Sequence, residues 1–224
     1  MAGHGAALWK DLPRRFSLYH TCHRRFQHWV RTGVLRQVSE ALSQDLYERS
    51  GIKLAERFID GSFSPAKKGG AEVGKTKRGT GTKLVAVADS QGVPIAAYLA
   101  SASLREVTLA QAPLDERFVV EPPQRLVGDK AGACPERSRR NSDRPDQALL
   151  QEGIELIAPH WPNRYQLTQH RRPLRRYRQR WKVERLFAWF HNFRRLMVRR
   201  ERYPQNFLGF IHLACILILF GRYL

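Results

Sequence analysis

Three carboxylates lie at positions in this chain where they could do chemistry. Asp60 ends the apolar run 54–60, Asp129 ends the short run 125–129, and Glu184 lies in a segment whose apolar residues recur with helical period. Ligands of α/β sheets tend to lie just outside strand ends, and hard divalent cations prefer carboxylate oxygens. Two strand ends and one helix therefore predict a magnesium site. Such a site suits phosphoryl transfer, in which two ions about 4 Å apart bind the attacking and the leaving oxygen.

The positive charge of the chain indicates a polyanionic partner. Lys and Arg total 39 of the 224 residues against 20 acidic residues, which gives a net charge of +19. Segment 164–202 alone holds fourteen of the basic residues and only two acids. A phosphate backbone is the partner that such clustering favours, and an anionic membrane surface is the alternative. The longest apolar run, residues 207–220, is shorter than the roughly 20 residues of a membrane-spanning helix. We therefore expect a buried terminal helix and a cytoplasmic protein with no membrane partner.

Hydrophobic periodicity predicts an α/β chain with a mixed sheet. Residues 8–50 should form two basic helices separated at Gly33, with Arg24 and Arg25 on the first. This pattern fits a helix-turn-helix-like DNA-binding element and a plain helical hairpin equally well. The expected strands are 54–60, 84–88, 93–99, 125–129 and 154–158, and the expected later helices are 104–115, 147–152 and a long helix from 174 to about 200. Residues 132–145 are polar and Pro-flanked, which predicts an inserted surface loop of low order.

The predicted long helix has two adjacent sectors at 100° per residue. The apolar sector, which should face the core, contains Val183, Leu186, Phe187, Phe190, Phe193 and Met197. The second sector contains Tyr177, Arg180, Glu184, His191 and Arg195. Glu184 thus lies at the border of the buried face, where a carboxylate can point into a cleft. Its spacing fits equally well a surface ion pair with Arg180 or Arg185.

Two other patterns are better explained without a catalytic role. Asp89 also ends an apolar strand, but the following residues 90–94 have turn chemistry, so we expect Asp89 to bond to the turn backbone. Residues 69–76 formally match the Walker A pattern, yet no strand directly precedes them and no helix start follows. We instead expect a flexible basic loop over 63–82, in which Lys75, Lys77 and Arg78 contact DNA phosphates.

Several segments together resemble the bacterial insertion-sequence transposases of the DDE class, whose catalytic domain is ribonuclease-H-like. They are Phe-Ile-Asp-Gly-Ser at 58–62, residues 78–94, Val-Gly-Asp-Lys-Ala at 127–131, Ile-Glu-Leu-Ile-Ala-Pro-His at 154–160, and residues 177–195. The most specific element is a Tyr, two residues, an Arg, three residues and a Glu, which Tyr177, Arg180 and Glu184 match. The family pattern often continues with a Lys seven residues after the Glu, where this chain has His191. The resemblance covers about residues 8–220.

The resemblance implies a mechanism and a set of partners. Asp60, Asp129 and Glu184 would hold two Mg²⁺ (or Mn²⁺) ions, water would attack the phosphodiester at each element end, and the freed 3′-hydroxyl would attack target DNA. Tyr177 and Arg180 would position the DNA, with His191 and Arg195 as further basic contacts. The implied partners are double-stranded DNA, as terminal inverted repeats and target, and further copies of the chain in a homo-oligomer at the nucleoid.

The expected organisation is a helical DNA-binding element at 1–50, a catalytic domain at 51–202 and a packing helix at 203–224. The chain begins later than the family pattern, so we expect the first element to be incomplete. The insertion 132–145 follows Asp129 closely and could displace it, and a shift near 1 Å can cost about a hundredfold in rate. Three alternatives therefore stay open: a non-catalytic DNA-binding remnant, a ribonuclease-H-like nuclease acting on RNA–DNA hybrids, and an RNA-binding structural protein.

Overall fold

The computed structural model describes residues 8–13, 15–104, 115–128, 149–151, 153–158 and 175–224. Its N-terminal part has a 3-10 turn, η1 (Trp9–Asp11), and two helices, α1 (Tyr19–Arg31) and α2 (Val34–Glu48). The predicted break at Gly33 is confirmed, because this residue has a φ of 72°, which glycine adopts without steric cost. The first helix begins later than predicted, and Phe16 and Tyr19 are exposed while Phe26 is buried.

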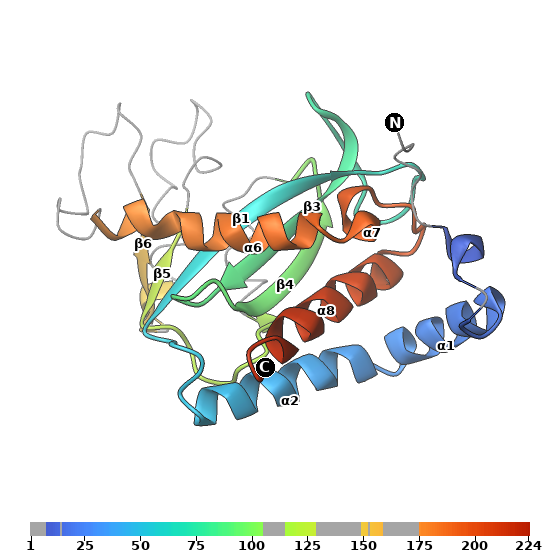
Figure 1. The fold of residues 1–224 in the computed structure, drawn as a ribbon. Coiled ribbons are helices and arrows are strands. Elements are labelled where there is room, and N and C mark those ends of the chain that lie inside the picture. The colour runs from blue at the N-terminus through green and yellow to red at the C-terminus, as the bar shows by residue number, and fades with distance from the viewer. Residues whose placement is uncertain (1–7, 14, 105–114, 129–148, 152, 159–174) are drawn as a thin grey trace.

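A mixed sheet forms the centre of the molecule (Figure 1). Its strands are β1 (Glu56–Pro65), β2 (Gly74–Thr76), β3 (Gly79–Ala88), β4 (Pro94–Ser101), β5 (Arg125–Val127) and β6 (Glu155–Ile157). Strand β3 is antiparallel to both β1 and β4, whereas β5 runs parallel to β1 and β6 runs parallel to β5. The predicted mixed sheet is confirmed, and the short β2 is an additional strand that pairs with the start of β3.

The first strands extend further than the hydrophobic pattern predicts. Strand β1 continues to Pro65, and the stretch 63–82, predicted as a flexible loop, contains β2 and the start of β3. Gly61 pairs with Val85 and Pro65 pairs with Gly81, because backbone hydrogen bonds do not require apolar side chains. The prediction that Asp60 ends its strand is therefore wrong, since it is the fifth residue of a ten-residue strand.

The predicted long helix is interrupted. Residues 175–177 form a helical turn, followed by η3 (Arg178–Arg180), α6 (Trp181–His191) and the short α7 (Arg194–Met197). Phe193 has an extended backbone with φ of −91° and ψ of 104°, which ends the helical path. The single helix to about residue 200 is therefore a wrong prediction. Of the predicted apolar sector, Val183, Leu186, Phe187 and Phe190 are buried, but Met197 beyond the break is 51% exposed.

Side-chain alternation in the sheet divides the core into two clusters. Leu84 and Ala86 of β3 pack with the buried residues of α6 and of α8 (Pro204–Phe220), whereas Val85 and Val87 join a second cluster that includes Leu46 of α2. Helix α8 lies against both α2 and β4, and α6 crosses β1 and β3 (Figure 1). The prediction of a buried terminal helix is confirmed. Among the described residues, no helix is both long and apolar enough to span a membrane.

Several predictions concern residues outside the described ranges. These are most of the helix at 104–115, the loop at 132–145 and the carboxylate Asp129. Of the predicted helix at 147–152, residues 149–151 are described and are helical.

Candidate active site

Asp60 lies on the face of β1 that is covered by α6. Strand alternation places Glu56, Phe58 and Asp60 on one face, and Phe58 is fully buried in the same cluster as Val183 and Leu186 of α6. The Asp60 side chain is 17% exposed, and its Oδ1 accepts a hydrogen bond of 2.8 Å from the Gly61 amide. The neighbouring strand β5 makes its last pair opposite Phe58, so Asp60 lies beyond the end of β5. This position leaves the carboxylate partly accessible at the point where the parallel strands end.

Arg180 joins Asp60 to Tyr177. Its Nη2 donates to Asp60 Oδ2 at 2.8 Å, and its Nη1 donates to the Tyr177 hydroxyl at 2.9 Å. Burial alone would lower the pKa of Arg180, but the hydrogen bonds and charges of Asp60 and Tyr177 outweigh it and raise that pKa above its ordinary value. The guanidinium therefore stays charged in this setting. Three of the residues that the sequence singles out thus form one hydrogen-bonded chain between β1 and the turns that precede α6.

Glu184 lies in the first turn of α6 and is exposed. It follows Arg180 by four residues, which places the two side chains on the same side of the helix with their Cβ atoms roughly 5–6 Å apart. The Arg180–Asp60 contact turns this side of α6 toward Asp60. Arg185, the other ion-pair partner considered for Glu184, packs its guanidinium 4.9 Å from the Trp181 ring centre and donates to the Gln91 carbonyl. None of the ion pairs between described residues includes Glu184.

The chemistry of these donors fits a divalent cation in part. Asp60 and Glu184 offer hard carboxylate oxygens from one side of the sheet, as Mg²⁺ requires. Among the described residues, however, no group of three His, Cys, Asp or Glu side chains could hold a metal ion. The third predicted ligand, Asp129, lies outside the described residues. In the structure, the positive charge beside Asp60 is supplied by Arg180.

The predicted DNA contacts occupy separate parts of the surface. Arg24 and Arg25 are exposed on α1, Lys75 is exposed on β2, and Lys77 and Arg78 are exposed in the turn after it. His191 is exposed at the last residue of α6.

Arg195 is placed differently from the prediction, because α6 ends before it. It lies on α7, where its Nη2 pairs with Glu201 Oε1 at 2.5 Å and its guanidinium lies 4.6 Å from the ring centre of Phe210. The prediction of a single sector running from Tyr177 to Arg195 is therefore wrong.

The prediction that Asp89 bonds to the turn backbone is confirmed, and the Walker A match has no phosphate-loop geometry. Asp89 is fully buried and accepts hydrogen bonds from the amides of Lys53, Gln91 and Val93 at 3.1, 2.7 and 2.8 Å. Burial raises the pKa of this carboxyl group. In the stretch that matches the Walker A pattern, Gly74–Thr76 is a strand, so no helix N-terminus is present there to bind a phosphate.

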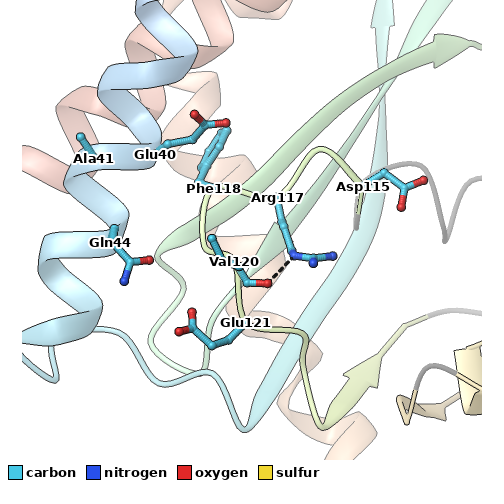
Figure 2. Close-up of a pocket in the computed structure, with 8 residues that line it drawn as sticks. All are labelled: Glu40, Ala41, Gln44, Asp115, Arg117, Phe118, Val120 and Glu121. Atoms are coloured by element: carbon cyan, nitrogen blue, oxygen red, sulfur yellow. Dashed lines mark hydrogen bonds between the residues drawn. The ribbon is translucent and has the colours of Figure 1, made fainter.

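A pocket of about 800 Å³ lies between α2 and segment 115–121 (Figure 2). Its lining contains acidic residues from both elements, and the Arg117 side chain donates to the Val120 carbonyl beside it. The lining residues are Glu40, Ala41, Gln44, Asp115, Arg117, Phe118, Val120 and Glu121. None of the residues predicted to be catalytic or to bind DNA lines this pocket, so it is separate from the Asp60 site.

Two further sets of polar contacts were not foreseen from the sequence, one on the Asp60 face of β1 and one around Arg199. Glu56, four residues before Asp60 on β1, pairs its Oε1 with Arg176 Nη1 at 2.8 Å. Arg199 is fully buried and donates to the carbonyls of Ala71, Glu72, Glu201 and Arg202 and to Thr82 Oγ1. The sequence signal for the first contact was the strand alternation that puts Glu56 on the Asp60 face. The contacts of Arg199 depend on where the predicted long helix is interrupted.

Comparisons with known proteins show the family to which this chain belongs. The family model described as "Transposase DDE domain" matches residues 53–219. A putative transposase for insertion sequence element IS402 from Burkholderia cepacia is 34% identical over 146 residues, which is 62% of this chain and 62% of that protein. The crystal structure of the Mos1 strand transfer complex is similar over 84% of this chain and 71% of that chain, with 13% identity and a TM-score of 0.27. Because the family model covers most of the chain, including Asp60, Tyr177, Arg180 and Glu184, the protein belongs to the DDE transposase family.

Proposed function

We propose that this protein is a metal-dependent DNA transposase that cleaves DNA at the ends of its element and joins those ends to target DNA. The observation that carries the proposal is the hydrogen-bonded chain from Tyr177 through Arg180 to Asp60, with Glu184 one turn further along the same side of the helix. Family membership supplies the reaction class. In the structure a carboxylate, a guanidinium and a phenol lie within reach of one another, and a site that binds a phosphodiester needs such groups.

The register of β5 supports Asp129 as the second strand-borne carboxylate. Glu56 to Phe58 pair in step with Arg125 to Val127. Gly128, the last described residue before Asp129, packs so closely on Ile59 that an added Cβ would lie 2.7 Å from Ile59 Cγ2. A chain that kept this register for two more steps beyond the Phe58–Val127 pair would bring residue 129 level with Asp60. We therefore assign Asp60, Asp129 and Glu184 as the ligands of two Mg²⁺ or Mn²⁺ ions.

Each residue has a defined task in this proposal. Bound magnesium would stabilise the charge that develops on the attacking and leaving oxygens of the scissile phosphate. Arg180 would transfer its Nη2 hydrogen bond from Asp60 to a phosphate oxygen, since a guanidinium forms strong charge-assisted hydrogen bonds with phosphates. The Tyr177 hydroxyl would keep its hydrogen bond from the other terminal nitrogen of that guanidinium. His191 would contact DNA near Glu184, and Arg195 would do so only if it left Glu201.

The remaining basic residues would bind the DNA backbone. Lys75, Lys77 and Arg78 project from one hairpin, and Arg24 and Arg25 project from α1, so they could contact separate stretches of phosphate. We propose that residues 1–50 bind the terminal inverted repeats, that 51–202, including the insertion 132–145, form the catalytic domain, and that 203–224 act as a packing helix. Two element ends require at least two active sites, so we propose a homo-oligomer that works at the bacterial nucleoid.

A supercoiled plasmid carrying the inverted repeats that flank the gene would test the proposal. We expect nicking at the repeat ends and strand-transfer products with Mg²⁺ or Mn²⁺, and loss of both with EDTA or with Asp60→Asn. The control Asp45→Asn removes a similar charge from α2, where Asp45 pairs with Arg49, and should leave the reaction intact. Asp60→Asn cleaving as fast as the unchanged protein would refute the proposed site.

The other outcomes identify the alternatives. Metal-independent binding to the repeats without cleavage would identify a non-catalytic remnant. Cleavage of RNA–DNA hybrids in the absence of strand transfer would identify a ribonuclease-H-like nuclease. Salt-sensitive binding to RNA with no metal dependence would identify an RNA-binding structural protein.

A further inference from the structure

We propose that Glu56 is a positioning residue, which holds segment 175–180 in the alignment on β1 that the Asp60 site needs. This inference rests on the proposed function, because it names a residue that sets the geometry of the same site. Glu56 is not a proposed metal ligand and contacts none of the reacting groups. It acts through Arg176, whose Nη1 lies 2.8 Å from Glu56 Oε1.

The contacts form a ladder between β1 and the residues that lead into α6. Three consecutive residues on one face of β1 each meet a basic side chain. Glu56 pairs with Arg176 and Asp60 pairs with Arg180. Between them, Lys182 Nζ lies 4.9 Å from the ring centre of Phe58. The two ion pairs therefore lie at either end of a single stretch of strand, and together they fix both the position and the direction of segment 175–180.

This segment needs such contacts because it has few apolar ones. Helix α6 is anchored by four fully or largely buried side chains, those of Val183, Leu186, Phe187 and Phe190. In contrast, Arg175, Arg178 and Gln179 are exposed, and Tyr177 is only partly buried against the core. The change from a helical turn at 175–177 to the 3-10 turn η3 and then to α6 also leaves the segment with fewer regular helical hydrogen bonds. Polar contacts with β1 therefore determine where Tyr177 and Arg180 lie.

Loss of Glu56 should change geometry much more than stability. The Glu56 and Arg176 side chains are 20% and 38% exposed, and ion pairs of this kind contribute little to the free energy of unfolding. A displacement of about 1 Å in a reacting group, however, can lower a rate by about a hundredfold. A positioning role therefore predicts a slow enzyme that is still fully folded.

The test compares Glu56→Gln with Glu155→Gln in the full-length protein. Glu155 makes a similar ion pair of 3.0 Å with Arg125, which lies opposite Glu56 on the neighbouring strand, so its variant controls for the loss of a nearby strand-borne acid that does not hold Arg176. For Glu56→Gln we expect the cleavage rate constant on repeat DNA to fall by roughly tenfold to a hundredfold, with the KM for DNA changed by less than about threefold. Hydrogen exchange of the amides at 175–180 should accelerate at least about threefold, with α6 and α8 unchanged. Glu155→Gln should show neither effect.

A charge exchange separates positioning from general structural damage. The double variant Glu56→Arg with Arg176→Glu restores the attraction with reversed signs, and should recover most of the lost rate and of the lost exchange protection. Unchanged exchange at 175–180 in Glu56→Gln, or no recovery in the double variant, would overturn the inference. If the unchanged protein does not cleave DNA and Asp60→Asn makes no difference, the proposed function fails. In that case the hydrogen exchange of the amides at 175–180 tests the positioning role by itself.

Discussion

The Arg180–Asp60 ion pair leads to a specific prediction about metal affinity. Arg180 Nη2 lies 2.8 Å from Asp60 Oδ2, and both side chains are largely buried, with 20% and 17% of their surfaces exposed. A divalent cation that binds Asp60 must share this carboxylate with the guanidinium or displace it. Replacement of Arg180 by Gln removes the competing charge while keeping a polar side chain of moderate length. We therefore expect Arg180→Gln to bind Mn²⁺ more tightly than the unchanged protein.

The size of the effect follows from charge and distance. A metal ion bonded to Asp60 at about 2.1 Å would lie roughly 5 Å from the guanidinium if both kept the same oxygen. Repulsion between charges of +2 and +1 at about 5 Å costs about 1.7 kcal/mol even at the dielectric constant of water. Displacement instead breaks a hydrogen bond between charged groups, which costs about 1.5–3 kcal/mol. Either route predicts that the Mn²⁺ dissociation constant of the variant falls by about tenfold or more.

Mn²⁺ titration followed by electron paramagnetic resonance would measure this change without any catalytic step. Arg178→Gln is the matched control, because Arg178 is an exposed arginine on the same 3-10 turn and its removal changes the net charge equally. Asp60→Asn should abolish the tight site in either background. Equal affinities in Arg180→Gln and the unchanged protein, or an equal gain in Arg178→Gln, would refute direct competition at Asp60.

Three further predictions concern the scaffold. Arg199→Met leaves four backbone carbonyls and a hydroxyl without their buried donor, and should lower the free energy of unfolding by about 3–5 kcal/mol in urea titrations. Gly209→Ala places a Cβ 2.5 Å from Val30 Cγ2 between α8 and α1, and should lower the free energy of unfolding by about 1–3 kcal/mol in thermal unfolding. Gly69→Ala is the control, because its Cβ meets no atom within 4 Å, and it should leave the stability unchanged. Burial and the charge of Arg36 lower the pKa of His212 from 6.5 to about 4, so the unfolded chain takes up a proton at a higher pH than the folded protein does. The free energy of unfolding should therefore fall by about 3 kcal/mol as the pH drops from 6.5 to 4, and His212→Gln should lose this dependence.

The sequence predicted the fold best where side chains determine the backbone. The continuous apolar run Leu84 to Ala88 and the helical period of Val183 to Phe190 correctly indicated a central strand and a helix packed on it. A strand buried on both faces needs apolar residues at every position, and a helix buried on one face needs them every three or four residues. It failed where backbone pairing is independent of side-chain polarity. Residues 61–65 extend β1 and pair with residues 81–85 without showing the apolar alternation that predicts a strand, and the end of α6 depends on an extended Phe193.

The candidate site could be predicted residue by residue but not contact by contact. Helical spacing places Arg180 and Glu184 on one side of a helix, and it leaves open whether Arg180 pairs with Glu184 or with something across the sheet. The structure shows that it pairs with Asp60, 120 positions away in the sequence. A local pairing with Glu184 would neutralise the helix carboxylate, whereas the observed pairing leaves it exposed and neutralises the strand carboxylate. The structure thus compensates one of the two described acids of the site. In the proposed mechanism a metal ion would replace Arg180 at Asp60 and a DNA phosphate would replace Asp60 at Arg180, and this exchange depends on a tertiary contact that no local motif contains.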